Sequence, residues 1–473
     1  MASPNIEFYE IPGSIRKPGK YFEFNTRLAV RTLPTNQQKV LIIGQMLESG
    51  TATPLQAVNV FSDDDAATLF GRGSMAHVMV AEAIGCNSYL QLQVVGVTDA
   101  QAAQKATGTL TVSGPANGTG TMSVWIGVTR VDVAVSADDT AVELAAALTT
   151  AINQKTALPV TATANAAVVT LTAKNGGAAG NDIAVRTHST ATGITAVVSA
   201  MAGGENDPDL SAALAAVFSA GHNIIISPFS TPAALTALRT HLNIVSGPLE
   251  QRGAIGVAGW QRTLATGTTL TSSINSGRIT IGWHNGSVKT PAQIAAAYAA
   301  VIASEEDPAR PLNTLAMNTL DVTALEGRPS RNEQENALYN GLTPFEVGPG
   351  DTVQIVRAIS TYTKNAEGVD DVSLLDITTI RTLDYVRKAC RERIALRFPR
   401  DKLSARTPPR VRSELLDVLY KMEELEIVEE VDSNKDKLIV ERDSQDVNRL
   451  DAAIPTDVVN GLHVFAARID LLL

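Results

Sequence analysis

Two stretches of the chain alternate short apolar runs with helical patterns of apolar residues. In the first, KVLIIGQ (39–45) and YLQLQVVGV (89–97) predict buried strands on either side of a helical segment at 64–83. The second stretch begins at Asp209 and repeats the pattern. Its predicted strands are NIIIS (223–227), GAIGVAG (253–259) and RITIGWHN (278–285), and its predicted helices lie at 209–219, from Pro232 and after Pro291. Strands separated by helices of this length predict right-handed crossovers and a largely parallel sheet covered on both faces.

The α/β pattern is interrupted between residues 99 and 205, where Thr, Val, Ala and Gly dominate. TGTLTVSG and TMSVWIGVTRVDVAV predict strands joined through a hairpin turn at Asn117-Gly118. An Ala-rich helix is predicted at 139–154, entered through Ser136 and the two acids that follow it. We therefore predict a mostly β domain inserted into the α/β domain.

The first 35 residues combine four prolines with large apolar side chains. Prolines at this density exclude a helix, yet the apolar content is too high for an idle tail. We predict an extended arm that packs on a partner surface, either in its own subunit or in a neighbour. The apolar residues assigned to this arm are Ile6, Phe8, Ile11, Tyr21, Phe22 and Phe24.

Strand patterns also occur near the end of the chain. DTVQIVRAISTYT (351–363) predicts a strand after a Pro- and Gly-rich connection (307–350), and KLIVER (437–442) predicts another. The ending LHVFAARIDLLL predicts a last strand with one apolar face. Because an unpaired apolar strand promotes aggregation, we expect it to join a sheet, in its own subunit or in another. The residues assigned to this strand are Leu462, Val464, Phe465, Ile469 and Leu471.

Charge is sorted along residues 381–436 as nowhere else in the chain. Residues 381–412 hold eleven Lys/Arg and three acids, a balance of +8, and residues 414–436 hold nine acids and two Lys, a balance of −7. Both halves carry an apolar stripe at spacings of three and four, which predicts a helix ending at Pro399 and a second with Thr407 as N-cap. Such a pair could associate head to tail with other copies, or the two helices could neutralise each other within one subunit.

Composition and charge restrict the class of protein. At 473 residues the chain is expected to form about three domains, and 44% apolar with 19% charged residues are globular values. A net charge of −10 argues against a general nucleic-acid or anionic-membrane binder. Two cysteines, Cys86 and Cys390, indicate a reducing compartment rather than a disulfide framework. We expect neither a signal peptide nor a membrane-spanning segment.

Because parallel α/β sheets commonly bind nucleotides, a nucleotide-dependent enzyme has to be considered. The sequence has no Walker A motif, no Gly-x-Gly-x-x-Gly after a predicted strand, no Gly-x-Ser-x-Gly and no His-Glu-x-x-His. The six histidines lack metal-ligand spacing, and Cys390 lies on the apolar stripe of its helix. We therefore expect no catalytic residues, no cofactor and no metal.

Three longer motifs resemble one family. They are IPGSIRKPGKYFEFN (11–25), RAISTYTKNAEGVDDVSLLDITTIRTLDYVRKACRERIALRFPR (357–400) and IPTDVVNGLHVFAARIDLLL (454–473). Together they resemble the tail sheath proteins of contractile-tailed bacteriophages, specifically the Mu-like branch. The resemblance is concentrated in residues 1–45 and 340–473, and it says least about the inserted domain.

The resemblance implies a structural role without an active site. Family members assemble as stacked hexameric rings around a tail tube and contract, which drives the tube through the bacterial envelope during genome delivery. It implies that the N-terminal arm and the C-terminal strand add to sheets of neighbouring subunits. The implied partners are other copies, the tail tube protein, and baseplate and tail terminator proteins, with no nucleic acid and no membrane insertion. The implied location is a virion tail assembled in the host cytoplasm.

Three alternatives remain at this point. A headless contractile particle, or tailocin, would use the same subunit. A β-domain adhesin would explain residues 99–205 but not the charged helices. A nucleotide-binding α/β enzyme would explain residues 209–305 but lacks the glycines.

The expected fold is a multi-domain α/β protein with a largely parallel core. Its predicted parts are an N-terminal arm (1–35), an α/β domain in two pieces (36–98 and 206–330), an inserted mostly β domain (99–205) and an α+β C-terminal domain with a terminal strand arm (331–473). Because the C-terminal domain faces the tube in the family, exposed charges there are expected to contact an acidic tube surface or a neighbouring subunit. The residues assigned to this contact are Arg381, Lys388, Arg391, Arg397, Arg400, Glu423, Glu424, Glu429 and Glu430.

Overall fold

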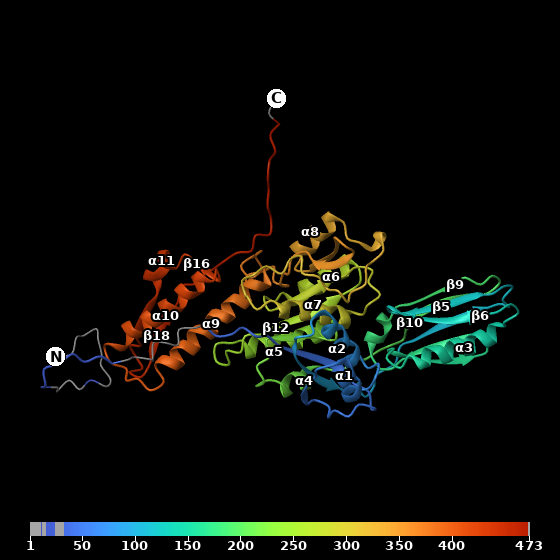
Figure 1. The fold of residues 1–473 in the computed structure, drawn as a ribbon, viewed down its shortest axis with the longest axis horizontal. Coiled ribbons are helices and arrows are strands. Elements are labelled where there is room, and N and C mark those ends of the chain that lie inside the picture. Colours follow the sequence, from blue (N-terminus) through green and yellow to red (C-terminus); the bar gives the residue numbers. More distant parts are fainter. Residues whose placement is uncertain (1–10, 12–15, 24–32, 472–473) are drawn as a thin grey trace.

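The computed structural model describes residues 11, 16–23 and 33–471 and shows an elongated molecule. A central α/β body lies between a β-rich domain at one end and a pair of long helices at the other (Figure 1). No helix among the described residues is both long and apolar enough to cross a membrane.

The central body is built on an eight-stranded sheet with the order β15-β14-β13-β12-β11-β1-β3-β2. Pairing is parallel from β14 to β3, and only the edge strands β15 and β2 are antiparallel. The strands are β1 (Lys39–Gln45), β2 (Ala57–Asn59), β3 (Gln91–Val97), β11 (Ile224–Ile226), β12 (Ile255–Trp260), β13 (Ile279–Trp283), β14 (Thr343–Gly348) and β15 (Thr352–Ile355). This pairing agrees with the predicted largely parallel sheet, for which the sequence predicts no strand order.

Both faces of this sheet are buried because alternate residues of each strand point to opposite sides. Val40 and Ile42 of β1 pack with α2 and α7, whereas Leu41 and Ile43 pack with α4, α5 and α6 on the other face. The helices are α1 (Asp63–Phe70), α2 (Met75–Cys86), α4 (Ser211–Ala216), α5 (Pro232–Val245), α6 (Leu264–Ile274), α7 (Pro291–Ser304) and α8 (Arg331–Tyr339), with a 3₁₀ turn η3 (Leu325–Gly327).

Local sequence explains where the helices of the body begin. α5 and α7 start with a threonine N-cap followed by proline, and in α7 the side chain of Gln293 completes a capping box with Thr290. The single helix predicted at 64–83 is in fact two helices. Gly71 and Gly73 separate them with φ values of 87° and 82°, a conformation that is unfavourable for other residues.

The predicted division at residue 330 is corrected by the sheet. β14 and β15 lie in the predicted C-terminal domain, yet β14 pairs with β13 and β15 closes that edge of the central sheet. β14 was missed because its residues fall in a connection rich in Pro and Gly, which resembles loop sequence.

Residues 107–202 form two antiparallel sheets and one helix around a core of their own. The sheets have the orders β10-β4-β8-β7 and β6-β5-β9, and the helix caps its first turn with a Thr140–Glu143 capping box. The elements are β4 (Thr107–Ser113), β5 (Gly120–Ile126), β6 (Thr129–Val135), α3 (Ala141–Gln154), β7 (Val160–Asn165), β8 (Val168–Ala173), η2 (Ala178–Asp182), β9 (Val185–Ser189) and β10 (Thr195–Ala202).

The predicted hairpin at Asn117-Gly118 is wrong. This dipeptide connects β4 to β5, which belong to different sheets. The Asn117 N–H donates to Thr192 O and the Ala116 N–H to Asp139 O, so the connection crosses the end of the domain instead of reversing the chain. The hairpin turn lies instead at Gly127-Val128, between β5 and β6. Likewise, α3 is entered through Thr140 rather than Ser136.

The C-terminal region contains two long helices and two two-stranded sheets. Its elements are α9 (Ile377–Arg397), α10 (Thr407–Glu424), β16 (Val428–Glu429), α11 (Val431–Asn434), η4 (Lys435–Lys437), β17 (Ile439–Arg442), β18 (Leu450–Ala453) and β19 (Asp457–Val458). Val386, Cys390, Val411, Leu415 and Met422 are buried between the helices, as the apolar stripes predict. Arg406 rather than Thr407 precedes the second helix. Leu383 and Leu425, which continue the three- and four-residue spacing of the two stripes, are exposed.

Candidate assembly surfaces

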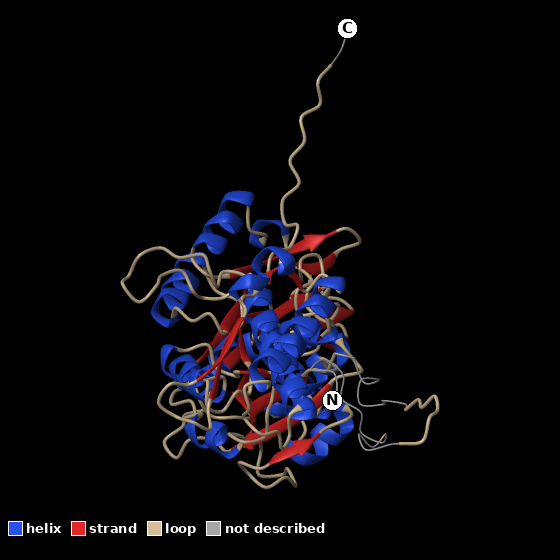
Figure 2. Ribbon diagram, turned by 90° about the vertical axis from the view of Figure 1, so that its left-hand side faces the viewer, coloured by secondary structure: helices blue, strands red, loops and turns tan. Residues whose placement is uncertain are grey.

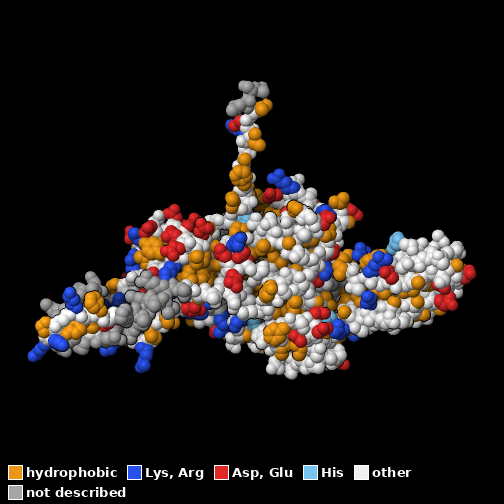
Figure 3. Space-filling view, viewed as in Figure 1, with side chains coloured by type: hydrophobic (Ala, Val, Ile, Leu, Met, Phe, Trp, Pro, Cys, Tyr) orange, Lys and Arg blue, Asp and Glu red, His pale blue; other side chains and the backbone are white. Residues whose placement is uncertain are grey.

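The last described residues leave the body of the molecule as an extended segment. Residues 459–471 contain no helix or strand and project away from the domains in both ribbon views (Figures 1 and 2). Their apolar side chains are exposed, and Figure 3 shows them along the projection. The exposed fractions are 77% for Leu462, 78% for Val464, 84% for Phe465, 96% for Ile469 and 82% for Leu471. These residues pair with none of the strands that the structure describes, so the predicted terminal strand does not form among the described residues of one chain.

The base of this segment is held against the body. His463 Nε2 lies 3.5 Å from Asp376 Oδ1, and Asp376 also accepts two hydrogen bonds from Arg357, at 2.8 and 2.7 Å. A Cβ atom at Gly461 would lie 2.6 Å from Pro311 Cγ, so the chain passes close to the body only because this residue is glycine. The base of the projecting segment is therefore held in place by contacts of Gly461 and His463 with the body.

Two small sheets of the C-terminal region have few partners. β16 pairs only with β19, and β17 pairs only with β18, among the strands of the described chain. A two-stranded sheet is marginally stable alone, so both depend on α10 and its neighbours for support. Their outer edges carry backbone groups that can pair with another strand.

The N-terminal arm is described only in part. Ile6, Phe8 and Phe24 lie outside the described residues. Ile11 is half-buried, whereas Tyr21 and Phe22 are 42% and 87% exposed. The sequence did not predict how the arm enters the body: Pro34 O accepts from the Tyr385 hydroxyl at 2.9 Å, and Thr35 O accepts from Lys388 Nζ at 2.8 Å.

The two charged helices neutralise each other in part, one of the two outcomes left open by the sequence. The buried Arg393 guanidinium donates to Glu414 at 3.1 Å and to Asp417 at 2.7 Å. Arg397 lies 3.4 Å from Glu414. Burial opposes ionisation of Asp417, but the hydrogen bond from Arg393 and the charge of Lys421 outweigh it, so the pKa of Asp417 is lowered.

Arg381 is buried, which corrects its assignment to an exposed contact surface. Only 7% of the residue is exposed, and its Nη2 donates to Glu305 O at 2.6 Å. The start of α9 lies against the end of α7, where Ile377 and Ile380 join the apolar core of the sheet. Because α9 packs both on the core of the central sheet and on α10, the side chain of Arg381 is not exposed. Lys388 and Arg397 are half-buried as well.

The remaining assigned charges lie at the surface to different degrees. Arg391, Arg400, Glu424, Glu429 and Glu430 are exposed. Glu423 is half-buried, and its carboxylate accepts a hydrogen bond from the Val431 N–H at 2.9 Å. Figure 3 shows acidic side chains gathered over the region of α11 and β16. Contact of these residues with a tube or a neighbour stays a prediction.

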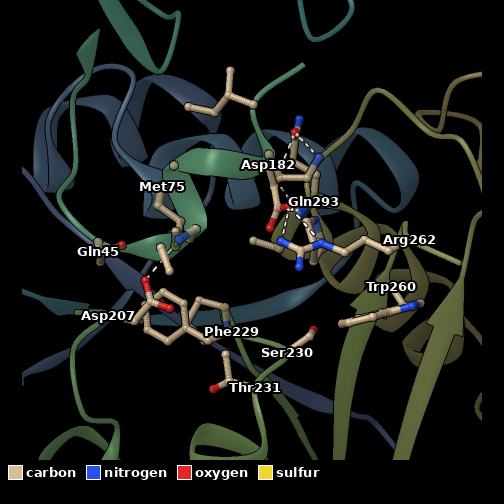
Figure 4. Close-up of a pocket in the computed structure, with 18 of the residues that line it drawn as sticks. Gln45, Met75, Asp182, Asp207, Phe229, Ser230, Thr231, Trp260, Arg262 and Gln293 are labelled. Carbon is tan, nitrogen blue, oxygen red and sulfur yellow. Dashed lines mark hydrogen bonds and ion pairs between the residues drawn. The ribbon is translucent and has the colours of Figure 1, made fainter. Parts of the chain in front are cut away.

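A pocket of about 450 Å³ lies at the carboxyl ends of the parallel strands, facing the inserted domain (Figure 4). This edge is where α/β proteins usually bind ligands. Its walls are mainly apolar, with Met75, Phe229 and Trp260 among them. The Arg262 guanidinium points to Asp182 of the inserted domain and donates to it at 2.7 Å.

The polar groups of this pocket form hydrogen bonds between the central body and the inserted domain or its connecting segments. Gln45 Nε2 donates to Asp99 and to Gly176 O, and Asp207 accepts from the Ala179 N–H. Burial raises the pKa of Asp207, although backbone donors oppose this shift. No phosphate-binding glycine loop follows β1 or β11, and the described residues contain no group of side chains that could hold a metal ion. The pocket therefore offers no recognisable catalytic arrangement.

Comparison with known proteins identifies a family for this chain. Residues 203–361 match the family described as phage tail sheath protein central domain, and residues 369–471 match the phage tail sheath C-terminal domain. Over 99% of the chain and 100% of the relative, the sequence is 34% identical to the Mu-like prophage FluMu tail sheath protein of Haemophilus influenzae.

Solved structures show the same fold at low sequence identity. The sheath tail protein of Desulfitobacterium hafniense is 16% identical, with a TM-score of 0.53 over 94% of this chain and 97% of that one. The sheath tail protein Lin1278 of Listeria innocua is 15% identical, with a TM-score of 0.52 over 92% of this chain and 94% of that one. The chain therefore belongs to the phage tail sheath family, as a Mu-like contractile tail sheath protein with a structural rather than an enzymatic role.

Proposed function

We propose that copies of this chain polymerise as stacked hexameric rings around a tail tube, and that contraction of the polymer drives the tube through a bacterial envelope during genome delivery. Exchanged terminal segments join the subunits. The projecting C-terminal segment is the observation that carries this proposal, since its apolar side chains are exposed while its base is held to the body.

Burial on a neighbour would stabilise this segment substantially. Fully burying an aliphatic or aromatic side chain contributes about 1.5–3 kcal/mol, so the five assigned residues contribute on the order of 10 kcal/mol before the entropy cost of ordering the segment. Main-chain hydrogen bonds to a neighbouring sheet would add to this. A water-exposed segment of this composition is therefore best explained by a partner subunit.

The small sheets of the C-terminal region are suitable receivers. β16 and β19 hold only two residues each and lie beside α10 and α9, respectively, so an added strand from another copy would extend this short sheet. Strand addition relies on backbone groups, which tolerate changes in the relative orientation of the connected bodies. The link can persist while contacts between the bodies change.

Contraction without a nucleotide has to draw on free energy stored during assembly. The contracted arrangement must then have more favourable contacts than the extended one, summed over many subunits.

We further propose that exposed charges such as Arg391, Arg400, Glu424, Glu429 and Glu430 contact the tube or a neighbour. Exposed ion pairs contribute only about 0–1 kcal/mol each, so repetition around the ring would have to supply their effect. Baseplate and terminator proteins would bind the ends of the polymer, and assembly would take place in the host cytoplasm before the sheath forms part of the virion tail.

Electron microscopy of the purified full-length chain tests this proposal directly. Versions lacking residues 1–25 or 459–473 are compared with it at several concentrations. Tubular polymers from the intact chain that disappear on either truncation support exchange of the terminal segments. If all three samples remain discrete monomers or dimers even after tail tube is added, the proposal is wrong.

A further inference from the structure

A polar pocket of about 260 Å³ lies at the opposite edge of the central sheet, at the amino ends of β1, β11 and β12. Residues that precede these strands form part of its wall, and one face of α9 forms the rest. The pocket is therefore separate from the apolar pocket at the carboxyl edge.

Five residues with cationic side chains line this second pocket. Among the described residues that line it, Asp384 is the sole acid, and its carboxylate already accepts hydrogen bonds from Arg278 and Arg387. Like charges gathered in a partly enclosed space raise one another's free energy, because water screens them less than at an open surface. The five residues are Lys39, Arg252, Arg381, Lys388 and Arg391, and the pocket that they line is here called the basic pocket.

Two of these residues each carry a guanidinium nitrogen that is buried without an acceptor among the described residues. Arg381 Nη2 donates to Glu305 O, but Arg381 Nη1 is buried without a hydrogen-bond partner among the described residues. Arg252 Nε is also buried without a hydrogen-bond partner among the described residues, although Nη2 of the same side chain donates to Glu250. A buried donor left unpaired costs about 1–3 kcal/mol, and more when charged, so folded proteins seldom leave one without a reason.

The acids near Arg381 offset the effect of burial on its charge only in part. Burial lowers the pKa of Arg381 to about 10, and the nearby Glu305 and Asp307 offset this effect only in part. Neither acid lines the basic pocket. A further negative group on the pocket side would therefore stabilise the charged guanidinium.

We propose that the basic pocket binds a single oxyanion, a carboxylate, sulfate or phosphate group. Guanidinium groups match the planar, two-oxygen geometry of such anions, and charge-assisted hydrogen bonds are the stronger kind. The volume accommodates one such group together with several waters, since a water occupies about 30 Å³ of liquid volume. In a polymer the oxyanion is an acidic side chain of a second copy, and in the free subunit it is an inorganic ion.

Equilibrium dialysis of the full-length chain against radiolabelled sulfate at low ionic strength tests the site. The unaltered chain should bind about one sulfate in a saturable manner, and Arg381→Gln should weaken binding about tenfold or more. Arg331→Gln, which removes the same charge from the exposed start of α8, is the matched control and should leave binding unchanged.

A second variant guards against misfolding of Arg381→Gln, because that side chain is buried. Arg391 is exposed and lines the basic pocket, so Arg391→Gln should fold normally and weaken sulfate binding several-fold. Circular dichroism melting curves show whether each variant is folded. Absence of saturable binding to the unaltered chain, or equal binding by Arg391→Gln and the Arg331→Gln control, overturns the proposal.

The source of the oxyanion is distinguished by competition and by the polymer itself. N-acetylglutamate should displace sulfate if the basic pocket accepts a side-chain carboxylate, and inorganic phosphate should displace it if the site takes free ions. In maps of assembled tubes, an acidic side chain of another copy in the pocket identifies the first source, and an isolated anion identifies the second. Dialysis does not require polymerisation, so failure of the sheath proposal and failure of this site give different results.

Discussion

Arg278 and Asp384 form a two-pronged ion pair that joins the start of β13 to α9. Arg278 Nη1 lies 2.7 Å from Asp384 Oδ2, Arg278 Nη2 lies 3.0 Å from Oδ1, and both side chains are 15% exposed. Arg387 donates to the same carboxylate at 2.8 Å. This one acid therefore helps to fix the C-terminal helices relative to the central sheet.

Replacement of Asp384 by Asn should destabilise the protein. The change leaves two arginines without their counter-ion in a mostly buried position, and we expect the free energy of unfolding to fall by about 2–4 kcal/mol. Urea denaturation followed by tryptophan fluorescence measures the effect. Asp470→Asn is the control, because its partner Arg468 is 86% exposed, and it should change stability by less than about 0.5 kcal/mol. Equal effects of the two changes would contradict the role assigned to Asp384.

Replacement of Gly253 by Ala should disturb the Arg278–Asp384 ion pair through a steric clash with Asp384. A Cβ atom at this position would lie 2.6 Å from Asp384 Cβ, which is closer than real contacts allow. We expect a loss of about 1–3 kcal/mol in the free energy of unfolding. Gly327→Ala is the matched control, since the atom nearest to a Cβ there, Asn285 O, would lie 3.6 Å away, which is an ordinary contact. A thermal melt in which both variants resemble the unaltered chain would refute this argument.

Acidification should destabilise the protein partly through His222. Burial, followed by the charges of Lys39 and His241, lowers the pKa of His222 from 6.5 to about 4 in the folded state. The neutral ring is thus favoured in the folded state, so its contribution is complete above pH 6.5 and is lost as pH falls from 6.5 towards 4. The contribution amounts to at most roughly 3 kcal/mol.

The His222→Gln variant isolates this contribution. The Gln amide can still donate to Gln93 Oε1, which lies 2.7 Å from His222 Nε2, but it does not titrate. The variant should show a smaller decrease in unfolding free energy between pH 7 and pH 4.5 than the unaltered chain. Identical pH dependence would mean that other groups, such as His241, account for the acid sensitivity.

Polar substitutions in the projecting segment should separate assembly from stability. Phe465→Ser and Ile469→Ser alter side chains that are 84% and 96% exposed, so the melting temperature of the free subunit should not change. Polymer formation should require at least about tenfold more protein, because the apolar contacts with a neighbour are lost. Ala466→Ser, on the opposite face of an extended segment, is the control for sedimentation assays. Unchanged polymerisation of Phe465→Ser and Ile469→Ser would argue against burial of this face.

Parts of the fold follow from sequence because their signals are local. KVLIIGQ predicts β1 with its residue bounds, and the Thr-Pro pairs mark the starts of α5 and α7. The Asn117-Gly118 turn was wrong because its hydrogen bonds go to Thr192 and neighbouring loops, which no local pattern reveals. β14 was missed for a similar reason, since this short strand owes its conformation to pairing with β13 on one side and β15 on the other.

The sequence by itself determined the strand and helix periodicities, the interruption of the α/β pattern and the opposed charges of two amphipathic helices, because these depend on neighbouring residues. The tertiary structure decided which charges are free to act. Arg381 and Arg393 belong to the same basic run as Arg391, yet packing buries the first against α7 and pairs the second with α10. The direction of each side chain, and therefore its dielectric surroundings and partners, is set by contacts between residues far apart in the chain. For that reason only the fold could show that cations from five separate positions converge on one pocket.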